Sequence, residues 1–242
     1  MQRALVTGGT GTIGEQILRD LAATNEYEVT FQFGMDDGAA ARIGADTGAI
    51  AWKIDLTQPF TLERSDFDIL INSAAVLLTK TLVHEIDESE LTTTINVNLL
   101  APFRMCQQCL PFMMEQRYGR IVNIGSIYAE RGCSRNSTYN MSKHGLLGLT
   151  RSLAHEYAEF GIAVNQVDPS AVESKMMERI AADNVERGRI DSVESYFDDI
   201  RGAIPVGRMA SPEDVSSAVL FLIRQSGFTT GVALPVDGGV IA

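Results

Sequence analysis

Short runs of β-branched and other apolar residues alternate with stretches of helical periodicity along the 242-residue chain. Strands are predicted at Ala4–Thr7, Glu28–Phe33, Ala49–Ile54, Phe67–Asn72, Arg120–Ile124, Ile162–Val167 and Val232–Val236. Helices are predicted at Gly11–Ala23, Glu88–Gln116, Ser137–Phe160 and Pro212–Arg224. Apolar strands that alternate with helices are typical of a parallel sheet covered on both faces. The pattern therefore predicts an α/β fold with a doubly wound parallel sheet of about seven strands.

A glycine-rich turn, TGGTGTIG at residues 7–14, connects the first predicted strand to the first predicted helix. Gly9, Gly11 and Gly14 match G-x-G-x-x-G, the pattern of dinucleotide-binding folds. In such a turn, backbone N–H groups and the positive end of the helix dipole face a pyrophosphate. The string alone also fits a turn that merely requires glycine. Its place between a strand and a helix favours a Rossmann-like, dinucleotide-binding fold.

Composition and charge narrow the class of protein. Hydrophobic residues make up 45% of the chain and charged residues 21%, which is ordinary for a globular protein. A net charge of −11 opposes binding to nucleic acid or to an anionic membrane. No apolar run approaches the length of a bilayer span, and the chain begins without a basic and apolar leader. We expect a single domain, residues 1–242, located in the cytoplasm.

The three cysteines do not indicate a disulfide framework, because their number is odd. Cys106 and Cys109 form a C-x-x-C within a predicted helix, but no second pair completes a set of metal ligands. We expect both to be small buried core residues, and we expect no metal site.

Residues 170–207 form a long segment in which no strand is predicted. Apolar residues recur in it at helical spacing, at Val193, Tyr196, Phe197, Ile200 and Ile204. The segment follows a strand end, where ligands bind in such sheets, and long strandless insertions in compact domains are often functional. We therefore expect a helical lid over the substrate; a surface helix without that role is the alternative.

The end of the second predicted strand bears on the choice between NAD and NADP. The acidic residue that binds the ribose hydroxyls of NAD is expected about 20 residues beyond the glycine turn. The chain there reads Phe33-Gly34, and Asp36 and Asp37 come too late. No carboxylate is placed to repel a 2′-phosphate, and no cation is placed to bind one. These residues leave both cofactors open; we favour NADP(H) slightly and do not exclude NAD(H).

The stretch STYNMSKHG places Tyr139 and Lys143 four residues apart in a predicted helix, hence on the same face. A tyrosine hydroxyl has an ordinary pKa near 10, and a neighbouring ammonium group would lower it. Such a pair can give a proton to a carbonyl oxygen or take one from an alcohol. The spacing alone is common, and an ordinary surface pair is the alternative.

Further motifs accompany this pair. Ser126 lies in IVNIGS just after a predicted strand, and Asn98 lies in INVNLLAPF within a predicted helix. With Tyr139 and Lys143 behind an N-terminal glycine turn, they resemble the short-chain dehydrogenase/reductase family, in its compact branch. The resemblance runs nearly end to end: KIDLT matches the family's adenine-contacting segment, INSAA its N-N-A-G turn, VNQVDPS its V-N-x-V-x-P-G, and the stretch from VGRMASPED to VDGG its C-terminal signature.

The resemblance implies a role for each catalytic residue. Tyr139 would be the general acid/base, and Lys143 would lower the pKa of Tyr139 and hold the nicotinamide ribose. Ser126 would hydrogen-bond the substrate oxygen, and Asn98 would anchor a water that relays protons through Lys143. The implied reaction is hydride transfer between nicotinamide and a carbonyl or secondary alcohol, in which the cofactor supplies the difficult chemistry.

The resemblance also implies the cofactor contacts. The backbone of Val172 would hold the carboxamide, Ser174 would reach the pyrophosphate, and Asp55 would contact the adenine. The implied cofactor-binding residues are Gly8, Thr10, Gly11, Thr12, Ile13, Gly14, Asp55, Leu56, Asn72, Ala74, Tyr139, Lys143, Pro169, Val172 and Ser174.

Two departures from the family pattern concern the cofactor site. The compact branch usually reads T-G-x-x-x-G-x-G, whereas this chain has Thr12 where that pattern has glycine and places its glycine at Gly11. That spacing is the one used by the extended branch of the family. Ser170 stands where the family has glycine, and its hydroxyl would either crowd the cofactor or touch the substrate. Ser73 and Ala75, in the N-N-A-G turn, are milder changes.

Within the family the pattern most resembles 3-oxoacyl-carrier-protein reductases, which reduce a β-keto thioester with NADPH. An acidic carrier would dock on basic residues, and Arg117 and Arg120 are candidates; ordinary complementation of a helix dipole explains them equally well. The alternatives are an oxidoreductase of a free small molecule and, more remotely, a non-catalytic nucleotide-binding sensor. The resemblance also implies a homodimer or homotetramer, which would pair the long helices near Glu88–Gln116 and Ser137–Phe160.

Overall fold

Seven parallel strands form one sheet in the computed structural model of the protein, which describes residues 1–78 and 80–242. The strands are β1 (Gln2–Thr7), β2 (Tyr27–Phe33), β3 (Ile50–Lys53), β4 (Ile69–Asn72), β5 (Gly119–Ile124), β6 (Ile162–Pro169) and β7 (Ala233–Val236). Their order is β3-β2-β1-β4-β5-β6-β7. The order reverses between β1 and β4, so that the carboxyl ends of these strands flank the position where ligands bind in doubly wound sheets. The predicted fold class is confirmed.

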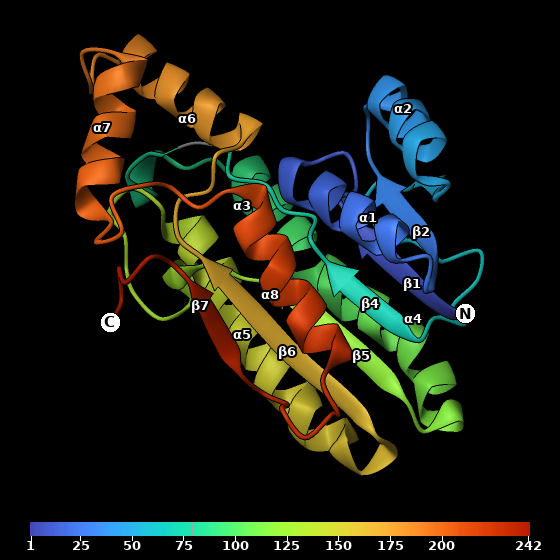
Figure 1. Ribbon diagram of the computed structural model, residues 1–242. Helices are drawn as coiled ribbons and strands as arrows, with labels where there is room; N and C mark the ends of the chain where they lie inside the picture. Colours follow the sequence, from blue (N-terminus) through green and yellow to red (C-terminus); the bar gives the residue numbers. More distant parts are fainter. Residues whose placement is uncertain (79) are drawn as a thin grey trace.

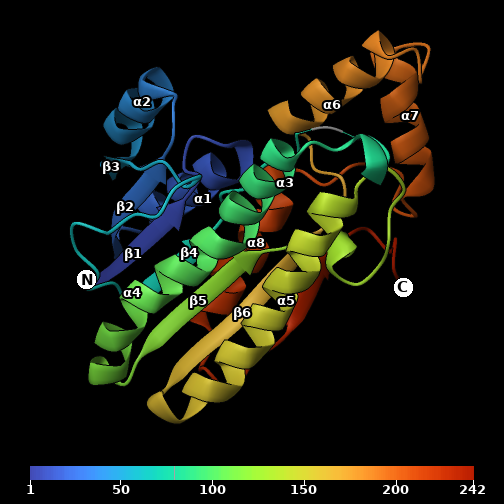
Figure 2. The ribbon, with the colours of Figure 1, turned by 180° about the vertical axis from the view of Figure 1, so that it is seen from behind.

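Helices cover both faces of the sheet (Figures 1 and 2). One face carries α1 (Thr12–Thr24), α2 (Asp37–Thr47) and α8 (Pro212–Arg224), and the other carries α3 (Glu88–Ile95), α4 (Ala101–Gln116) and α5 (Ser137–Tyr157). Each face has its own apolar core. Ile17, Leu21 and Val219 are fully buried on the first side. Met105, Cys106 and Cys109 are buried on the second, as expected for the two cysteines.

The long helix predicted at Glu88–Gln116 is interrupted in the structure. A π-helical turn, η2 (Asn96–Leu100), separates α3 from α4. A π-turn widens the helix locally, and such turns are frequent at functional sites. It contains Asn98, and the side chain of Asn96 donates a hydrogen bond to the carbonyl of Thr57, 2.9 Å away. The predicted first and last residues of this helical segment are therefore confirmed, but the prediction of one uninterrupted helix was wrong.

Two further helices, α6 (Lys175–Glu186) and α7 (Val193–Ala203), lie between β6 and α8. Figure 1 shows them beyond the carboxyl ends of the strands. Helix α7 matches the predicted apolar spacing, whereas α6 was not predicted. Two arginines fasten this segment to the loop after β4: Arg179 donates to the carbonyl of Leu77, and Arg189 donates to the carbonyl of Lys80.

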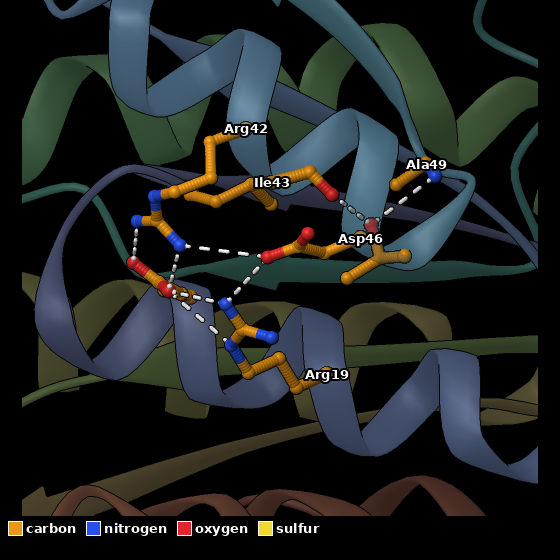
Figure 3. A network of polar contacts seen from close by, with 7 residues as sticks. Arg19, Arg42, Ile43, Asp46 and Ala49 are labelled. Atoms are coloured by element: carbon orange, nitrogen blue, oxygen red, sulfur yellow. Dashed lines mark hydrogen bonds and ion pairs between the residues drawn. The ribbon is translucent and has the colours of Figure 1, made fainter.

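An ion-pair network joins α1 to α2 at the side of the sheet (Figure 3). Glu15, in the first turn of α1, accepts two hydrogen bonds of 2.8 Å from the guanidinium of Arg42 and a further one of 2.9 Å from Arg19. Arg19 also contacts Asp46 at 3.0 Å. The hydrogen bonds from Arg42 hold the pKa of Glu15 at about 2, although partial burial opposes this.

The Glu15 network predicts a pH-dependent stability difference. The folded-state pKa of Glu15 lies below its unfolded value, so its contribution is present above about pH 4.5 and is lost as the pH falls toward about 2. Because both arginines are partly exposed, Glu15→Gln should lower the free energy of unfolding by only about 1 kcal/mol at neutral pH. Urea unfolding at about pH 7 and about pH 3.5 measures the difference, which should shrink at the lower pH. Asp46→Asn, which removes a more exposed carboxylate, is the control and should cost less. Equal stability of Glu15→Gln and the parent at pH 7 would contradict the assignment.

Candidate active site

A cavity of about 790 Å³ opens at the carboxyl edge of the sheet. Its lining runs from the glycine turn, past the ends of β4 and β5, to Tyr139 and the segment that carries α6 and α7. The predicted site residues that line it are Gly8, Thr10, Gly11, Thr12, Ile13, Gly14, Asp55, Leu56, Ala74, Ser126, Tyr139, Lys143, Pro169, Val172 and Ser174. The structure thus brings the predicted catalytic and cofactor residues to one continuous site, except for Asn72 and Asn98.

The glycine turn needs glycine at defined positions. Gly8 has a φ of +67°, and a Cβ on it would lie 2.7 Å from the Cα of Ala74. A Cβ on Gly14 would lie 2.2 Å from the carbonyl oxygen of Gly8. Gly11 is the N-cap of α1 and donates its N–H to that same carbonyl at 2.9 Å. Thr12 is then the first residue of α1, which places the N-terminus of the helix at the cavity.

Three residues meet where β5 ends against the start of α5. Ser126 lies beside the hydroxyl of Tyr139, where its side chain favours a lower pKa of that phenol. Lys143 lies one helical turn beyond Tyr139, and its Nζ is 5.5 Å from the centre of the tyrosine ring. The Lys143 ammonium donates a hydrogen bond of 2.7 Å to the carbonyl of Ile124, the last residue of β5. The helix face therefore presents both groups to the strand end, as the spacing predicted.

Burial dominates the protonation of this cluster. Burial raises the pKa of Tyr139 to about 12, although the side chain of Ser126 opposes the rise. Burial lowers the pKa of Lys143 to about 8, and the negative charge of Asp168 opposes that decrease. The lowered tyrosine pKa expected from the Tyr139–Lys143 spacing is therefore absent in this structure, because burial disfavours the phenolate and the charge of Asp168 adds to the rise. At neutral pH the tyrosine is a phenol and the lysine is an ammonium ion.

Asn98 and Asn72 support the site from behind its surface. The side chain of Asn98 accepts a hydrogen bond from the N–H of Val76 at 2.8 Å and donates to its carbonyl at 2.9 Å and to Ser142 at 3.2 Å. Asn72 is buried and donates to the side chain of Asn123, on β5, at 2.8 Å. Neither residue lines the cavity.

Two side chains that the sequence analysis did not single out also organise the site. Gln32, at the end of β2, accepts a hydrogen bond from the N–H of Gly8 at 2.9 Å and donates to the carbonyl of Ile54 at 2.7 Å. Asp168, at the end of β6, accepts a hydrogen bond from the N–H of Ser126 at 2.8 Å. The apolar pattern of β2 and β6 did not indicate these roles, although the sequence shows a polar residue within each strand.

Ser170 and the two carboxylates that follow Gly34 have local partners in the structure. The hydroxyl of Ser170 donates to the carbonyl of Asp237 at 3.3 Å, so it has a partner at the end of β7. At the other end of the cavity, Asp36 is the N-cap of α2 and accepts from the N–H of Ala39, while Asp37 pairs with Lys53 at 2.6 Å. Both carboxylates that follow Gly34 are therefore engaged in capping or pairing.

Comparison with known proteins identifies the family. A family model described as "Enoyl-(Acyl carrier protein) reductase" matches residues 13–241. The chain belongs to the short-chain dehydrogenase/reductase family and is an oxidoreductase of that family. The resemblance found in the sequence is confirmed.

Individual relatives resemble the chain over nearly its whole length. It is 32% identical to an acetoacetyl-CoA reductase of Allochromatium vinosum, covering 98% of this chain and 97% of that protein. It is also 32% identical to a 3-oxoacyl-(acyl-carrier-protein) reductase of Escherichia coli, covering 98% and 96%. A solved structure of an actinorhodin polyketide ketoreductase with NADPH is 28% identical, with a TM-score of 0.88 and coverage of 99% and 97%.

Proposed function

We propose that the protein reduces the ketone of a 3-oxoacyl (β-keto) thioester with NADPH. The observation that carries the proposal is the grouping of Ser126, Tyr139 and Lys143 in one cavity that is continuous with the glycine turn. A protonated phenol beside an ammonium ion is the state required to give a proton to a developing alkoxide. The substrates named for the relatives from A. vinosum and E. coli support the same class of ketone.

The residues of this chain suit a dinucleotide. The glycine turn lines the cavity, Gly8 and Gly14 leave no room for a Cβ, and the N-terminus of α1 adds a partial positive charge there. Gly8, Gly11, Thr12 and Gly14 would hold the pyrophosphate, as the sequence resemblance implies. A bound nicotinamide would supply the hydride. Asp36 caps α2 and Asp37 pairs with Lys53, so neither of these carboxylates after β2 is free. This arrangement supports NADP(H), as does the NADPH in the structural neighbour.

Each catalytic group then has one task. The Tyr139 hydroxyl gives its proton to the ketone oxygen, and the hydroxyl of Ser126, which lies beside Tyr139, donates to the same oxygen and orients it. The Lys143 ammonium stabilises the phenolate that remains. Asn98 keeps the role implied by the family, the anchoring of a proton-relaying water, and its hydrogen bonds to Val76 hold the loop after β4 in place.

The segment 170–207 is proposed to be the substrate lid. Met176, Met177, Tyr196 and Ile200 of this segment line the cavity, and thus α6 and α7 would cover the reacting ketone. The hydrogen bonds from Arg179 and Arg189 to the loop after β4 would hold the lid closed.

A free ketone that carries an anionic group is the second candidate substrate, and the charge of the cavity favours it. Among the described residues, the lining contains the cations Lys80, Arg131, Lys143 and Lys175 and one carboxylate, Asp55. The basic residues considered for docking of a carrier protein, Arg117 and Arg120, give that docking less support. Arg120 is only 5% exposed and donates to carbonyls of the protein itself, including those of Gly119 and Gly161.

The family also supports a homodimer or homotetramer. Phe103 on α4 and Met141 on α5 are about half exposed, and burial of this apolar surface against a second copy would stabilise an isologous contact. Among the residues described, no helix has the length and hydropathy needed to cross a membrane. The cytoplasmic location remains a prediction.

Replacing the proposed proton donor tests the mechanism. Tyr139→Phe should lower kcat/KM for ketone reduction by at least about 100-fold, because a positioned general acid contributes that much, while NADPH affinity stays nearly unchanged. Steady-state kinetics and fluorescence titration with NADPH measure the two quantities. Tyr157→Phe, at the far end of the same helix, is the matched control and should retain activity. Residual activity of Tyr139→Phe well above one per cent would refute the acid role.

A carboxylate introduced at the end of β2 tests the cofactor choice. A Cβ on Gly34 meets no atom within 4 Å, so Gly34→Asp fits without displacing its neighbours. The new carboxylate would repel a 2′-phosphate and accept hydrogen bonds from ribose hydroxyls. The ratio of kcat/KM for NADPH to that for NADH should fall at least about tenfold. Gly38→Asp adds the same charge one turn later and should change the ratio less. A parent enzyme that prefers NADH would refute the NADP(H) proposal.

A substrate panel separates the two candidate substrates. Acetoacetyl-CoA, acetoacetyl-pantetheine and free acetoacetate share a ketone but differ in charge and in the thioester. The proposal predicts that both thioesters have a higher kcat/KM than acetoacetate. A preference for acetoacetate, reduced at least about tenfold by Arg131→Gln, would instead select the anionic free ketone. Failure of all ketones to oxidise bound NADPH would favour a non-catalytic nucleotide sensor.

A further inference from the structure

A buried carboxylate lies directly behind the proposed catalytic residues. Asp168, at the end of β6, is 2% exposed. Its Oδ1 accepts two hydrogen bonds of 2.8 Å, one from the N–H of Ser126 and one from the side chain of Gln166. Burying a carboxylate costs free energy unless hydrogen bonds and opposite charges compensate for lost water. The position is the variable one in V-N-x-V-x-P-G, so the family pattern assigns it no role.

The backbone of β5 is adapted to this carboxylate. A Cβ on Gly125, the residue before Ser126, would lie 2.0 Å from Oδ1 of Asp168 and 2.4 Å from Nε2 of Gln166. Only glycine at this position allows the carboxylate to approach the N–H of Ser126. Gly125 in turn donates its own N–H to the carbonyl of Val167 at 2.8 Å. The hydrogen bond between Asp168 and Ser126 is therefore part of how the loop after β5 is held.

The charged groups around Asp168 come from several elements. Helix α5 contributes Lys143 and Tyr139, and the segment after the 3-10 turn Ile127–Ala129 contributes Glu130. The neighbouring strand β7 places Pro235 opposite Asp168, which adds no charge. Burial raises the pKa of Asp168 to about 6, while the hydrogen bonds from Gln166 and Ser126 and the charge of Lys143 oppose the rise. The carboxylate is thus ionised at neutral pH. Lys143 is held close by, because it donates to the carbonyl of Ile124, two residues before the Ser126 N–H that Asp168 binds.

We propose that Asp168 is a positioning residue for the reaction: its negative charge keeps Lys143 in the ammonium form, and its Oδ1 fixes the backbone at Ser126. The proposal rests on the functions proposed above for Lys143 and Ser126. Without the carboxylate, no negative charge would oppose the effect of burial on Lys143, and the lysine would lose its proton at a lower pH. The enzyme would then lose the cation that stabilises the Tyr139 phenolate within the neutral range.

The charge effect can be measured without turnover. The sequence has four lysines, Lys53, Lys80, Lys143 and Lys175, so NMR of protein labelled with ¹³C at lysine Cε gives few signals, and Lys143→Arg identifies that of Lys143. Asp168→Asn keeps an oxygen that can accept both hydrogen bonds but removes the charge. It should lower the pKa of Lys143 by about one unit from its parent value near 8. Glu130→Gln removes an exposed charge of the same sign and should shift it much less. An unchanged Lys143 pKa in Asp168→Asn overturns the proposal.

Kinetics test the consequence for the reaction. In ketone reduction, the alkaline limb of kcat/KM against pH should move to lower pH by the same amount in Asp168→Asn. Asp168→Ala should show the same shift and, in addition, a lower kcat on the plateau, because the N–H of Ser126 loses its acceptor. Equal plateaus for the two variants would overturn the positioning of Ser126. A shifted Lys143 pKa with an unmoved kinetic limb would instead refute the function proposed for Lys143.

Discussion

The buried ammonium group of Lys143 is the constraint around which the carboxyl edge of the sheet is arranged. The residue is 1% exposed, and a charge removed from water is stable only where other groups replace its hydration. The carbonyl of Ile124 at the end of β5 and the carboxylate of Asp168 at the end of β6 supply this replacement. Helix α5 must therefore pack against both strand ends, and the same packing places Tyr139 beside Ser126. The packing that stabilises the buried Lys143 therefore also sets the positions of Tyr139 and Ser126.

The cavity has a charge opposite to that of the chain as a whole. The protein carries a formal net charge of −11, yet the described residues that line the cavity include four cations and one carboxylate. Such local focusing raises the concentration of anionic ligands at a site in spite of the overall charge. A phosphate-bearing cofactor and an anionic or thioester substrate both suit this field. The acidic residues are used elsewhere, as in the Glu15 network between α1 and α2.

Much of the fold could be predicted because local and global signals agree. The seven strands are short runs that contain β-branched and other apolar residues. Pro212–Arg224 was predicted to its terminal residues, and a serine cap precedes a proline at its first helical position. Helix α2 was missed because it contains glycines and buries only Ala40 and Ile43. The π-turn at Asn98 was missed because a shift in backbone hydrogen bonding leaves no periodic trace in the sequence.

The candidate site also contains residues that could be predicted from the sequence and residues that could not. Tyr139 and Lys143 could be found from their spacing on one helix face, and Ser126 from the resemblance to the motifs of the family. Asp168 and Gln32 could not, because their partners, Ser126 and Gly8, are distant in sequence and the bonds depend on the closed sheet. The protonation of Tyr139 was predicted in the wrong direction for this structure, since helical spacing conveys the proximity of a cation but not the cost of burial.

The most direct test of the proposed mechanism is a crystal structure of the protein with NADPH and an unreactive analogue of a β-keto thioester. The ketone oxygen should lie within hydrogen-bonding distance, about 2.6–3.2 Å, of both the Tyr139 hydroxyl and the Ser126 hydroxyl, with the nicotinamide ring against the ketone carbon. A ketone bound away from Tyr139, or a nicotinamide outside the cavity at the carboxyl edge, would contradict it.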